Sequence, residues 1–168
     1  MDDTSLAHAH ITCQDDDALS FSVPFNPTSV KLGRQLNWAE QATQGQPYTL
    51  VQFSNGASDT FQASMLVDES ESDASVLPVV SRFYDLTRPV EAPEGGGPRP
   101  PCLIFSWEEL RFHGVVKSLD IEILLFDRSG RPKRAMVNLS LVGKAFASGA
   151  SAEDFFDQVY VAPTLGAP

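Results

Sequence analysis

The sequence predicts a mainly β fold, an antiparallel β-barrel or sandwich with one helix packed against it. Most apolar segments alternate with polar or small residues at a period of two, which is typical of half-buried strands. One segment repeats its apolar residues at spacings of three and four, which indicates an amphipathic helix. Because 168 residues can support one hydrophobic core, we expect a single domain that buries both patterns.

After the first 18 residues, two strands joined by a turn are expected. Residues 19–25 (LSFSVPF) alternate apolar and small polar side chains, and Asn26-Pro27 ends this strand. A second strand is expected over residues 29–38. Residues 39–47 contain no apolar stripe and end in turn-forming residues, so we expect an exposed loop there.

Two further strands are predicted at residues 48–53 and 60–67. The Asn55-Gly56 pair between them is typical of a two-residue hairpin turn, so the chain is expected to reverse direction there. The acidic run that follows, residues 68–73 (DESESD), is expected to be a solvated loop.

The predicted helix covers residues 76–86. Pro78 is acceptable because it falls in the first turn, and Ser75 is placed to cap the amino end. The apolar residues that recur on one face are Val76, Val79, Val80, Phe83 and Leu86.

The longest strands are predicted after residue 101. Residues 87–101 are rich in Pro, Gly and charge and are expected to form a loop within the domain. Strands are predicted at 102–107, 110–126 and 135–146, with a turn at 127–130 between the last two.

The pattern divides the chain into three parts. Residues 1–18 are polar and acidic and are predicted to be a flexible N-terminal arm or a weak first strand. Residues 19–147 form the β domain. Residues 148–168 are a C-terminal tail without periodicity.

Composition excludes several classes of function. A net charge of −10 argues against nucleic-acid binding, which depends on clustered Lys and Arg. The sequence has no apolar run long enough to insert into a membrane and no signal-peptide pattern. Cys13 and Cys102 predict neither a disulfide framework nor a zinc site, so we expect the protein to be made in the cytoplasm.

Four basic residues gather near the turn at 127–130, and this group has two interpretations. We expect a solvated turn or a salt-bridging protein contact more than an anion-binding site. The residues are Arg128, Arg131, Lys133 and Arg134.

No set of residues specifies a reaction, so the sequence predicts a non-enzymatic protein without cofactor or metal. His8 and His10 lack carboxylate or Cys partners at metal-ligand spacing. Cys102 with His113 could form a thiol–imidazole pair, but a Cys in a strand is more often a small buried apolar residue.

An ordered series of short motifs over residues 21–146 resembles the contractile injection system tube proteins, in particular their baseplate tube-initiator branch. Each motif alone is weak, and their order gives the resemblance its specificity. The motifs are Val23-Pro24-Phe25-Asn26-Pro27, Leu36-Asn37-Trp38, Leu66-Val67-Asp68, the helix, residues 101–107 after the Pro-rich loop, residues 112–116 and the hairpin 124–135.

The resemblance implies a structural subunit with a tube-type β-barrel fold that assembles as a ring, and it implies six copies in that ring. Such a ring would be coaxial with the inner tube at the baseplate and would join tube to spike as a tube initiator or adaptor. Its implied partners are copies of itself, inner tube subunits, the spike or hub, and other baseplate proteins. The expected interface residues are Phe25, Asn26, Pro27, Trp38, Trp107, Gly114, Gly130, Pro132 and Arg134.

Two departures from the family pattern leave alternatives open. The chain carries no C-terminal LysM module, and the aromatic residue expected soon after Asn26-Pro27 is absent. A cap-end tube adaptor or terminator of the same particle is therefore a second hypothesis, and a small ligand-binding barrel or hydrolase is a third. The particle would assemble in the cytoplasm and be either released or membrane-anchored.

Overall fold

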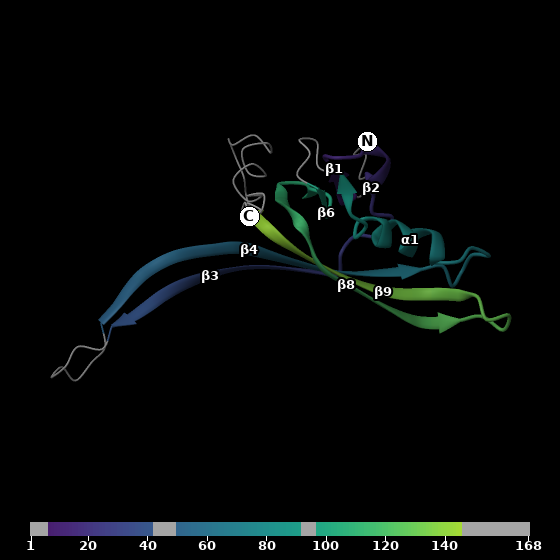
Figure 1. Cartoon of the computed structure of the whole chain (residues 1–168). Coiled ribbons are helices and arrows are strands. Elements are labelled where there is room, and N and C mark those ends of the chain that lie inside the picture. The colour runs from purple at the N-terminus through teal and green to yellow at the C-terminus, as the bar shows by residue number, and fades with distance from the viewer. Residues whose placement is uncertain (1–6, 42–49, 92–96, 146–168) are drawn as a thin grey trace, which may run out of the picture.

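The described part of the chain contains one antiparallel sheet of seven strands, in the order β2-β1-β7-β8-β9-β4-β3, a second sheet of two short strands, and one α-helix. Figure 1 shows the arrangement of the chain. The computed structural model describes residues 7–41, 50–91 and 97–145. Mainly β with one helix was the predicted fold class, and it is confirmed. The sheet strands are β1 His10–Cys13, β2 Phe21–Ser22, β3 Ser29–Gln41, β4 Leu50–Asp68, β7 Leu103–Trp107, β8 Leu110–Phe126 and β9 Pro132–Ala145; a 3-10 turn, η1, covers Asp17–Leu19, α1 covers Leu77–Asp85, and β5 Val90–Glu91 pairs with β6 Pro98–Arg99.

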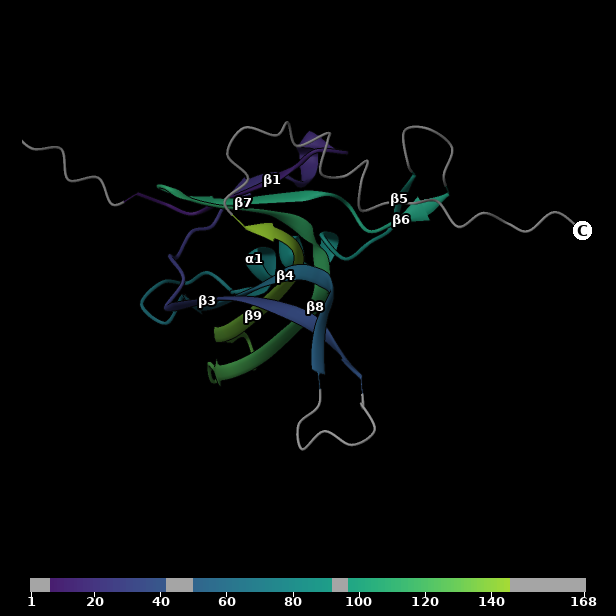
Figure 2. The ribbon, with the colours of Figure 1, turned by 90° about the vertical axis from the view of Figure 1, so that its left-hand side faces the viewer.

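The long strands β8 and β9 fold the sheet over the helix. β8 begins beside β7 and continues beside β9, so these two strands connect an upper and a lower part of the sheet. Figure 2 shows β1 and β7 above α1 and β3, β4 and β9 below it. Phe61 of β4 meets Phe105 of β7 and Phe112 of β8, with ring centroids 4.6 and 5.2 Å apart, which joins both parts in one core.

Two opposed glycines permit the close approach of β8 and β9 where the sheet turns over. Gly114 lies directly opposite Gly143. A Cβ atom on Gly143 would lie 1.9 Å from the carbonyl oxygen of His113, and one on Gly114 would lie 2.5 Å from the carbonyl oxygen of Val142. Both contacts are with backbone, which cannot move aside as a side chain can, so only glycine fits at either position.

The helix forms as predicted, with Pro78 in its first turn. Its N-cap is Val76, and Ser75, one residue earlier, supplies the amino-end hydrogen bond by accepting from the Leu77 N–H at 3.3 Å. Phe83 is buried and meets Phe21 of β2 edge to face at 5.2 Å. No helix in the described part of the chain is long and apolar enough to span a membrane.

The predicted hairpin at Asn55-Gly56 is wrong. β4 runs without interruption from Leu50 to Asp68, and Asn55 and Gly56 pair with residues of β3. Gly56 is not in the left-handed region that a type I′ turn requires. The long partner strand offers pairing throughout, and two register irregularities accommodate the pair instead.

The N-terminal segments also differ from expectation. Of the two alternatives for residues 1–18, the weak first strand describes His10–Cys13, which lies between β2 and β7 and buries Ile11 and Cys13. The strand predicted at 19–25 shortens to Phe21–Ser22, because the chain first makes the 3-10 turn η1, in which Ala18 N–H donates to the carboxylate of Asp16.

Other boundaries shift by a few residues. The predicted loop at 39–47 begins later, since β3 reaches Gln41, and its remainder lies outside the described residues. The Pro-rich segment 87–101 contains the short β5–β6 pair. The turn at 127–130 is confirmed: Asp127 Oδ1 accepts from the Ser129 N–H at 2.8 Å, and Gly130 has φ +83°.

We predict that Gly143→Ala lowers the free energy of unfolding by about 3 kcal/mol, because its Cβ must displace the backbone of β8. Urea unfolding followed by circular dichroism measures this. Gly56→Ala is the matched control, since a Cβ there meets nothing within 4 Å, and its stability should stay within about 0.5 kcal/mol of wild type. Equal effects of the two substitutions would contradict the proposed close approach.

Candidate assembly surfaces

Two long strand edges are unpaired within the described residues. β3 lies at the end of the sheet and pairs only with β4. On the side opposite β9, β8 pairs with β7 only as far as Gly114, which leaves residues 115–126 without a strand neighbour. These two edges bound a four-stranded unit, β8-β9-β4-β3, and they run in opposite directions because every pair within the unit is antiparallel. An unpaired edge of this length is a template for another strand.

A second surface is the two-stranded arm, defined as residues 36–41 of β3 and 50–56 of β4. β9 pairs with β4 only from Asp59 onward, so the arm extends away from the rest of the protein (Figure 1). One face carries four exposed apolar side chains: Leu36 (48%), Trp38 (56%), Val51 (62%) and Phe53 (52%). Trp38 lies opposite Phe53, with ring centroids 5.6 Å apart.

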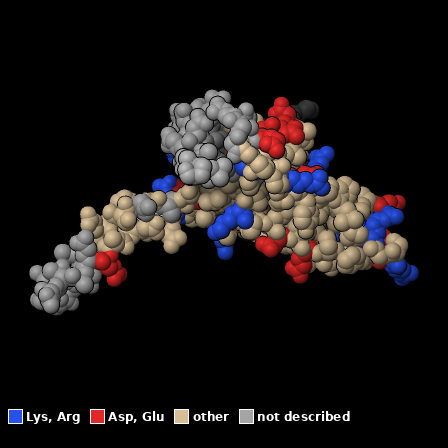
Figure 3. Space-filling view, viewed as in Figure 1, with Lys and Arg blue, Asp and Glu red and all other residues tan. Residues whose placement is uncertain are grey.

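The arm is almost uncharged, in contrast with the opposite end of the molecule. Among its residues only Glu40 carries a charge, and Figure 3 shows its surface as largely neutral while Lys, Arg, Asp and Glu gather over the remainder. Contiguous apolar surface on a soluble chain marks an interaction site. The arm face therefore has the character of a protein contact surface.

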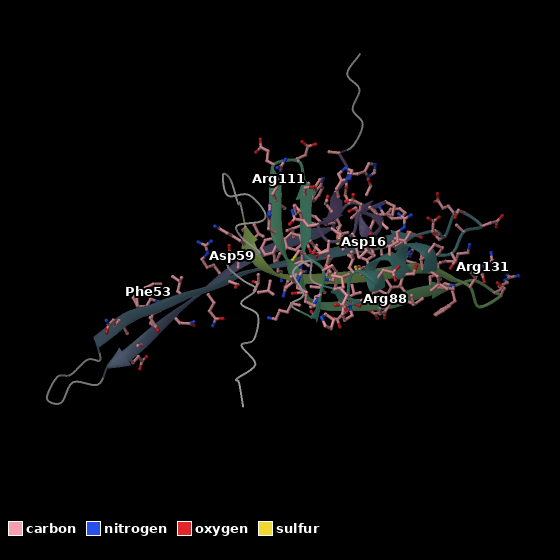
Figure 4. The ribbon with its side chains drawn as sticks, turned by 45° about the horizontal axis from the view of Figure 1, so that its top comes forward. Asp16, Phe53, Asp59, Arg88, Arg111 and Arg131 are labelled. Carbon is pink, nitrogen blue, oxygen red and sulfur yellow. The ribbon has the colours of Figure 1, made fainter. Side chains whose placement is uncertain are left out.

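Asp59 lies where β4 separates from β9, and its side chain links the separating strands (Figure 4). Its side chain is buried, and it accepts from Arg34 Nε at 2.5 Å and Nη2 at 2.8 Å. It also accepts from the Ala145 N–H at 2.9 Å, a backbone donor beyond the last residue of β9 that pairs with β4. The guanidinium of Arg34 lowers the pKa of Asp59, against the opposing effect of burial.

Two of the four basic residues near the turn at 127–130, Lys133 and Arg134, bind the acidic loop 68–74. Lys133 is buried and donates to two backbone carbonyls of this loop, each at 2.7 Å. Arg134 forms an ion pair with Asp68 at 2.7 Å. Hydrogen bonds from Ser70 and then from Arg134 lower the pKa of Asp68 to about 2. The salt-bridging interpretation of this group is therefore the one that the geometry supports, and the contact lies within the chain.

Four of the predicted interface residues gather around the N-terminal segment. Asn26 Nδ2 donates to the carbonyl of Ala7 at 3.0 Å, and Trp107 Nε1 donates to the same carbonyl at 3.1 Å. Phe25 packs against the core, and Pro27 is buried. These residues fix the start of the chain against β7, and their part in an interface stays a prediction.

The other five lie apart from this group. Gly114 serves the close approach to β9, Gly130 the turn, and Pro132 the start of β9. Arg134 pairs with its own loop. Among the aromatic residues of the nine, Trp38 on the arm is the one with most of its surface exposed.

Sequence reasoning missed Leu36, Val51 and Phe53 as surface residues. Their alternation with polar neighbours at 36–38 and 51–53 correctly indicated strands. Period-two alternation normally places the apolar face on a core, and nothing local distinguishes a core from an unpartnered face. The signal that could have found them is the near absence of charge over the same stretch.

The thiol–imidazole pair considered for Cys102 and His113 finds no support in the geometry. Burial raises the pKa of Cys102 to about 12, so its thiol is a poor nucleophile. The sulfur lies 3.2 Å from Nη1 of Arg99, whose guanidinium also pairs with Asp15 at 2.7 Å. His113 is buried, which lowers its pKa, and its Nδ1 has no hydrogen-bond partner in the described part of the chain.

Comparison with known proteins gives one family and several structural similarities. Residues 6–150 match the family described as contractile injection system tube protein. The Dit protein of phage SPP1 is similar in fold (TM-score 0.45, 8% identity), covering 79% of this chain and 49% of that chain, so this chain spans about half of its length. Chains of a native gene transfer agent virion (TM-score 0.42, 9% identity, 82% and 93% covered) and of an empty gene transfer agent tail (0.43, 7%, 83% and 92%) are also similar. No curated protein matches in sequence.

We predict that Asp59→Asn lowers the free energy of unfolding by about 2 kcal/mol at neutral pH, because the buried carboxylate loses its charge-assisted bonds. The folded-state pKa of Asp59 is depressed, so its contribution is present above the unfolded pKa of about 3.9 and is lost as pH falls through the folded pKa. The difference between wild type and variant should therefore shrink below about pH 4.

Urea unfolding between pH 7 and pH 3 tests this. Asp85→Asn is the control, because Asp85 pairs with a largely exposed Arg88 and such surface pairs contribute little. A pH-independent difference for Asp59→Asn would show that charge is not what Asp59 contributes.

Proposed function

Because this chain belongs to the contractile injection system tube protein family, whose members are structural proteins of phage tail-like particles, we propose that it forms a ring coaxial with the inner tube. In this proposal the ring lies at the baseplate, contains six copies, and joins the tube to the spike as a tube initiator or adaptor. Residues 19–147 are the ring-forming domain, and β1 from the preceding segment completes its sheet.

The observation that supports a ring is the pair of unpaired edges on opposite sides of β8-β9-β4-β3. β3 of one copy and β8 of the next run in opposite directions, so the joint continues the antiparallel order of the sheet. An interface between two different edges repeats from copy to copy and closes as a ring when the rotation allows. Closure also removes the exposed edges that otherwise invite aggregation.

The apolar face of the arm supports a second contact, with a neighbouring subunit. In the isolated chain Trp38 and Phe53 pack on each other and are otherwise open to solvent. Burying about 200 Å² of apolar surface there would contribute about 5 kcal/mol to assembly. Because the arm extends beyond the part of β4 that pairs with β9, it lies outside the region where the two edges would join.

The proposed partners are other copies of this chain, inner tube subunits on one side of the ring, and the spike or hub and further baseplate proteins on the other. Assembly would take place in the cytoplasm, and the finished particle would be released or membrane-anchored. A cap-end adaptor or terminator uses the same surfaces at the other end of the tube, and gold labelling of the chain on isolated particles distinguishes the two ends.

The mass of the purified chain by light scattering, alone and with its cognate tube subunit at two salt concentrations, tests the ring. A ring-sized species, or one that forms only with the tube subunit, is the expected result. A monomer that ignores the tube subunit under all conditions would overturn the proposal.

We predict that Trp38→Ser with Phe53→Ser abolishes or strongly weakens the ring-sized species and leaves the melting temperature of the monomer within about 2 °C. The physical reason is that both rings are exposed in the monomer and contribute to its core hardly at all. Leu77→Ser, at an equally exposed position on α1, is the control and should leave assembly unchanged. Assembly of the arm variant at wild-type level would show that the apolar face is not a subunit contact.

A further inference from the structure

Each unpaired edge carries exposed charge that forms no ion pair among the described residues. Lys31 lies on β3, and Asp120 and Glu122 lie on the unpaired part of β8. Four ion pairs form among the described residues, and none includes these three side chains. The unpaired part of β8 also carries exposed Lys117, at the register irregularity between Val116 and Ser118. Beyond that irregularity, the acids of β8 are opposite in charge to Lys31 of β3.

On β3 the charge lies on the polar face of the sheet. Val30 and Leu32 are opposite buried Ala63 and Phe61, so they lie on the core face. Because successive side chains of a strand point to opposite faces, Lys31 lies on the other face.

On β8 the acids lie on the same polar face. Leu119, Ile121 and Ile123 pack against the core. Asp120 and Glu122 alternate with them and are exposed. A strand that continues the sheet keeps core face with core face and polar face with polar face.

We propose that Lys31 of one copy pairs with Asp120 and Glu122 of the next copy, fixing the register and the direction of ring assembly. This inference rests on the proposed ring. Face alternation and antiparallel addition allow Lys31 to lie directly opposite either Asp120 or Glu122, with the other acid on the diagonal, and the charges favour these two registers over the others. Opposed residues lie about 5 Å apart and diagonal ones about 7 to 8 Å, so a lysine reaches both.

The same charges disfavour the wrong pairings. Two β3 edges would bring Lys31 against Lys31, and two β8 edges would bring Asp120 and Glu122 against the same acids. Like charges opposite each other destabilise strand pairs. Symmetric dimers, which would end assembly at two copies, are therefore less stable than the head-to-tail joint.

In the correct register the core face is also completed. Leu32, 41% exposed at the edge of the sheet, falls opposite Leu119 or Ile121 of the next copy. Both are only partly buried in the single chain. The charge pairing thus brings together edge residues that each lack one neighbour.

A charge-reversal experiment in the full chain tests the pairing. Lys31→Glu places acidic side chains on both edges, and Asp120→Lys with Glu122→Lys places basic side chains on both. Each variant alone should therefore lose the ring-sized species, because the affinity of each joint falls about tenfold or more. Mixing the two variants in equal amounts should restore it, because every joint between unlike variants is again complementary. Native mass spectrometry should then find the two variants in equal numbers within each ring.

Matched controls separate this effect from net charge. Arg128→Glu and the pair Glu108→Lys with Glu109→Lys change exposed charges at turns away from both edges and should assemble as wild type. All variants should keep the wild-type melting temperature, since the altered side chains make no ion pair within the part of the chain that the structure describes.

The possible failures are distinguishable. A ring that forms normally from each reversal variant would overturn the charge pairing and leave the ring intact. Increased association of Lys31→Ala would show instead that these charges guard the edges against pairing. If wild type forms no ring alone or with its tube subunit, the proposed function itself fails.

Discussion

The carboxylate of Asp59 stabilises the branch on which the shape of this protein depends. At this residue β4 leaves β9 and continues with β3 alone, while β8 and β9 turn over toward β7. The buried Asp59 carboxylate accepts a hydrogen bond from the Ala145 N–H, which lies beyond the β4–β9 ladder. It also forms an ion pair with Arg34 on β3. Without it, a partly buried backbone donor would lose its partner at the place where the strands part. The fold also needs the glycine pair at 114 and 143, because it lets β8 and β9 approach each other closely where they turn over.

The branch also explains why so much of the sheet remains unpaired. Among the described residues, the second half of β8 has no strand neighbour on the side where β7 pairs with its first half. The arm likewise packs on no core there, because β4 continues beyond β9 with β3 alone. Soluble monomers usually cover or shorten such edges. Here both edges are long, Lys31 on one is opposite in charge to Asp120 and Glu122 on the other, and the arm is apolar on one face. These features suit a subunit whose structure is completed by its neighbours.

The residues of the candidate surfaces illustrate how far local sequence reaches. Asn26 and Trp107 were expected in an interface, and both bind the carbonyl of Ala7, eighty-one residues apart in sequence from each other. Residue type indicates that a side chain seeks a partner, but not whether that partner lies in the same chain. Trp38 was identified as notable from its motif, whereas Phe53, its contact across the arm, was hidden by the expected hairpin turn.

The sequence alone determined the fold class, the helix and the long β8–β9 hairpin, because these follow from periods and turn residues within a few positions of one another. Only the tertiary structure decided that β4 continues through Asn55-Gly56, that His10–Cys13 joins the sheet, and that the apolar face of the arm is exposed. Each of these depends on which distant strand lies alongside. A strand pattern specifies one apolar face and two edges, and the pairing of long-range neighbours decides which of them are covered.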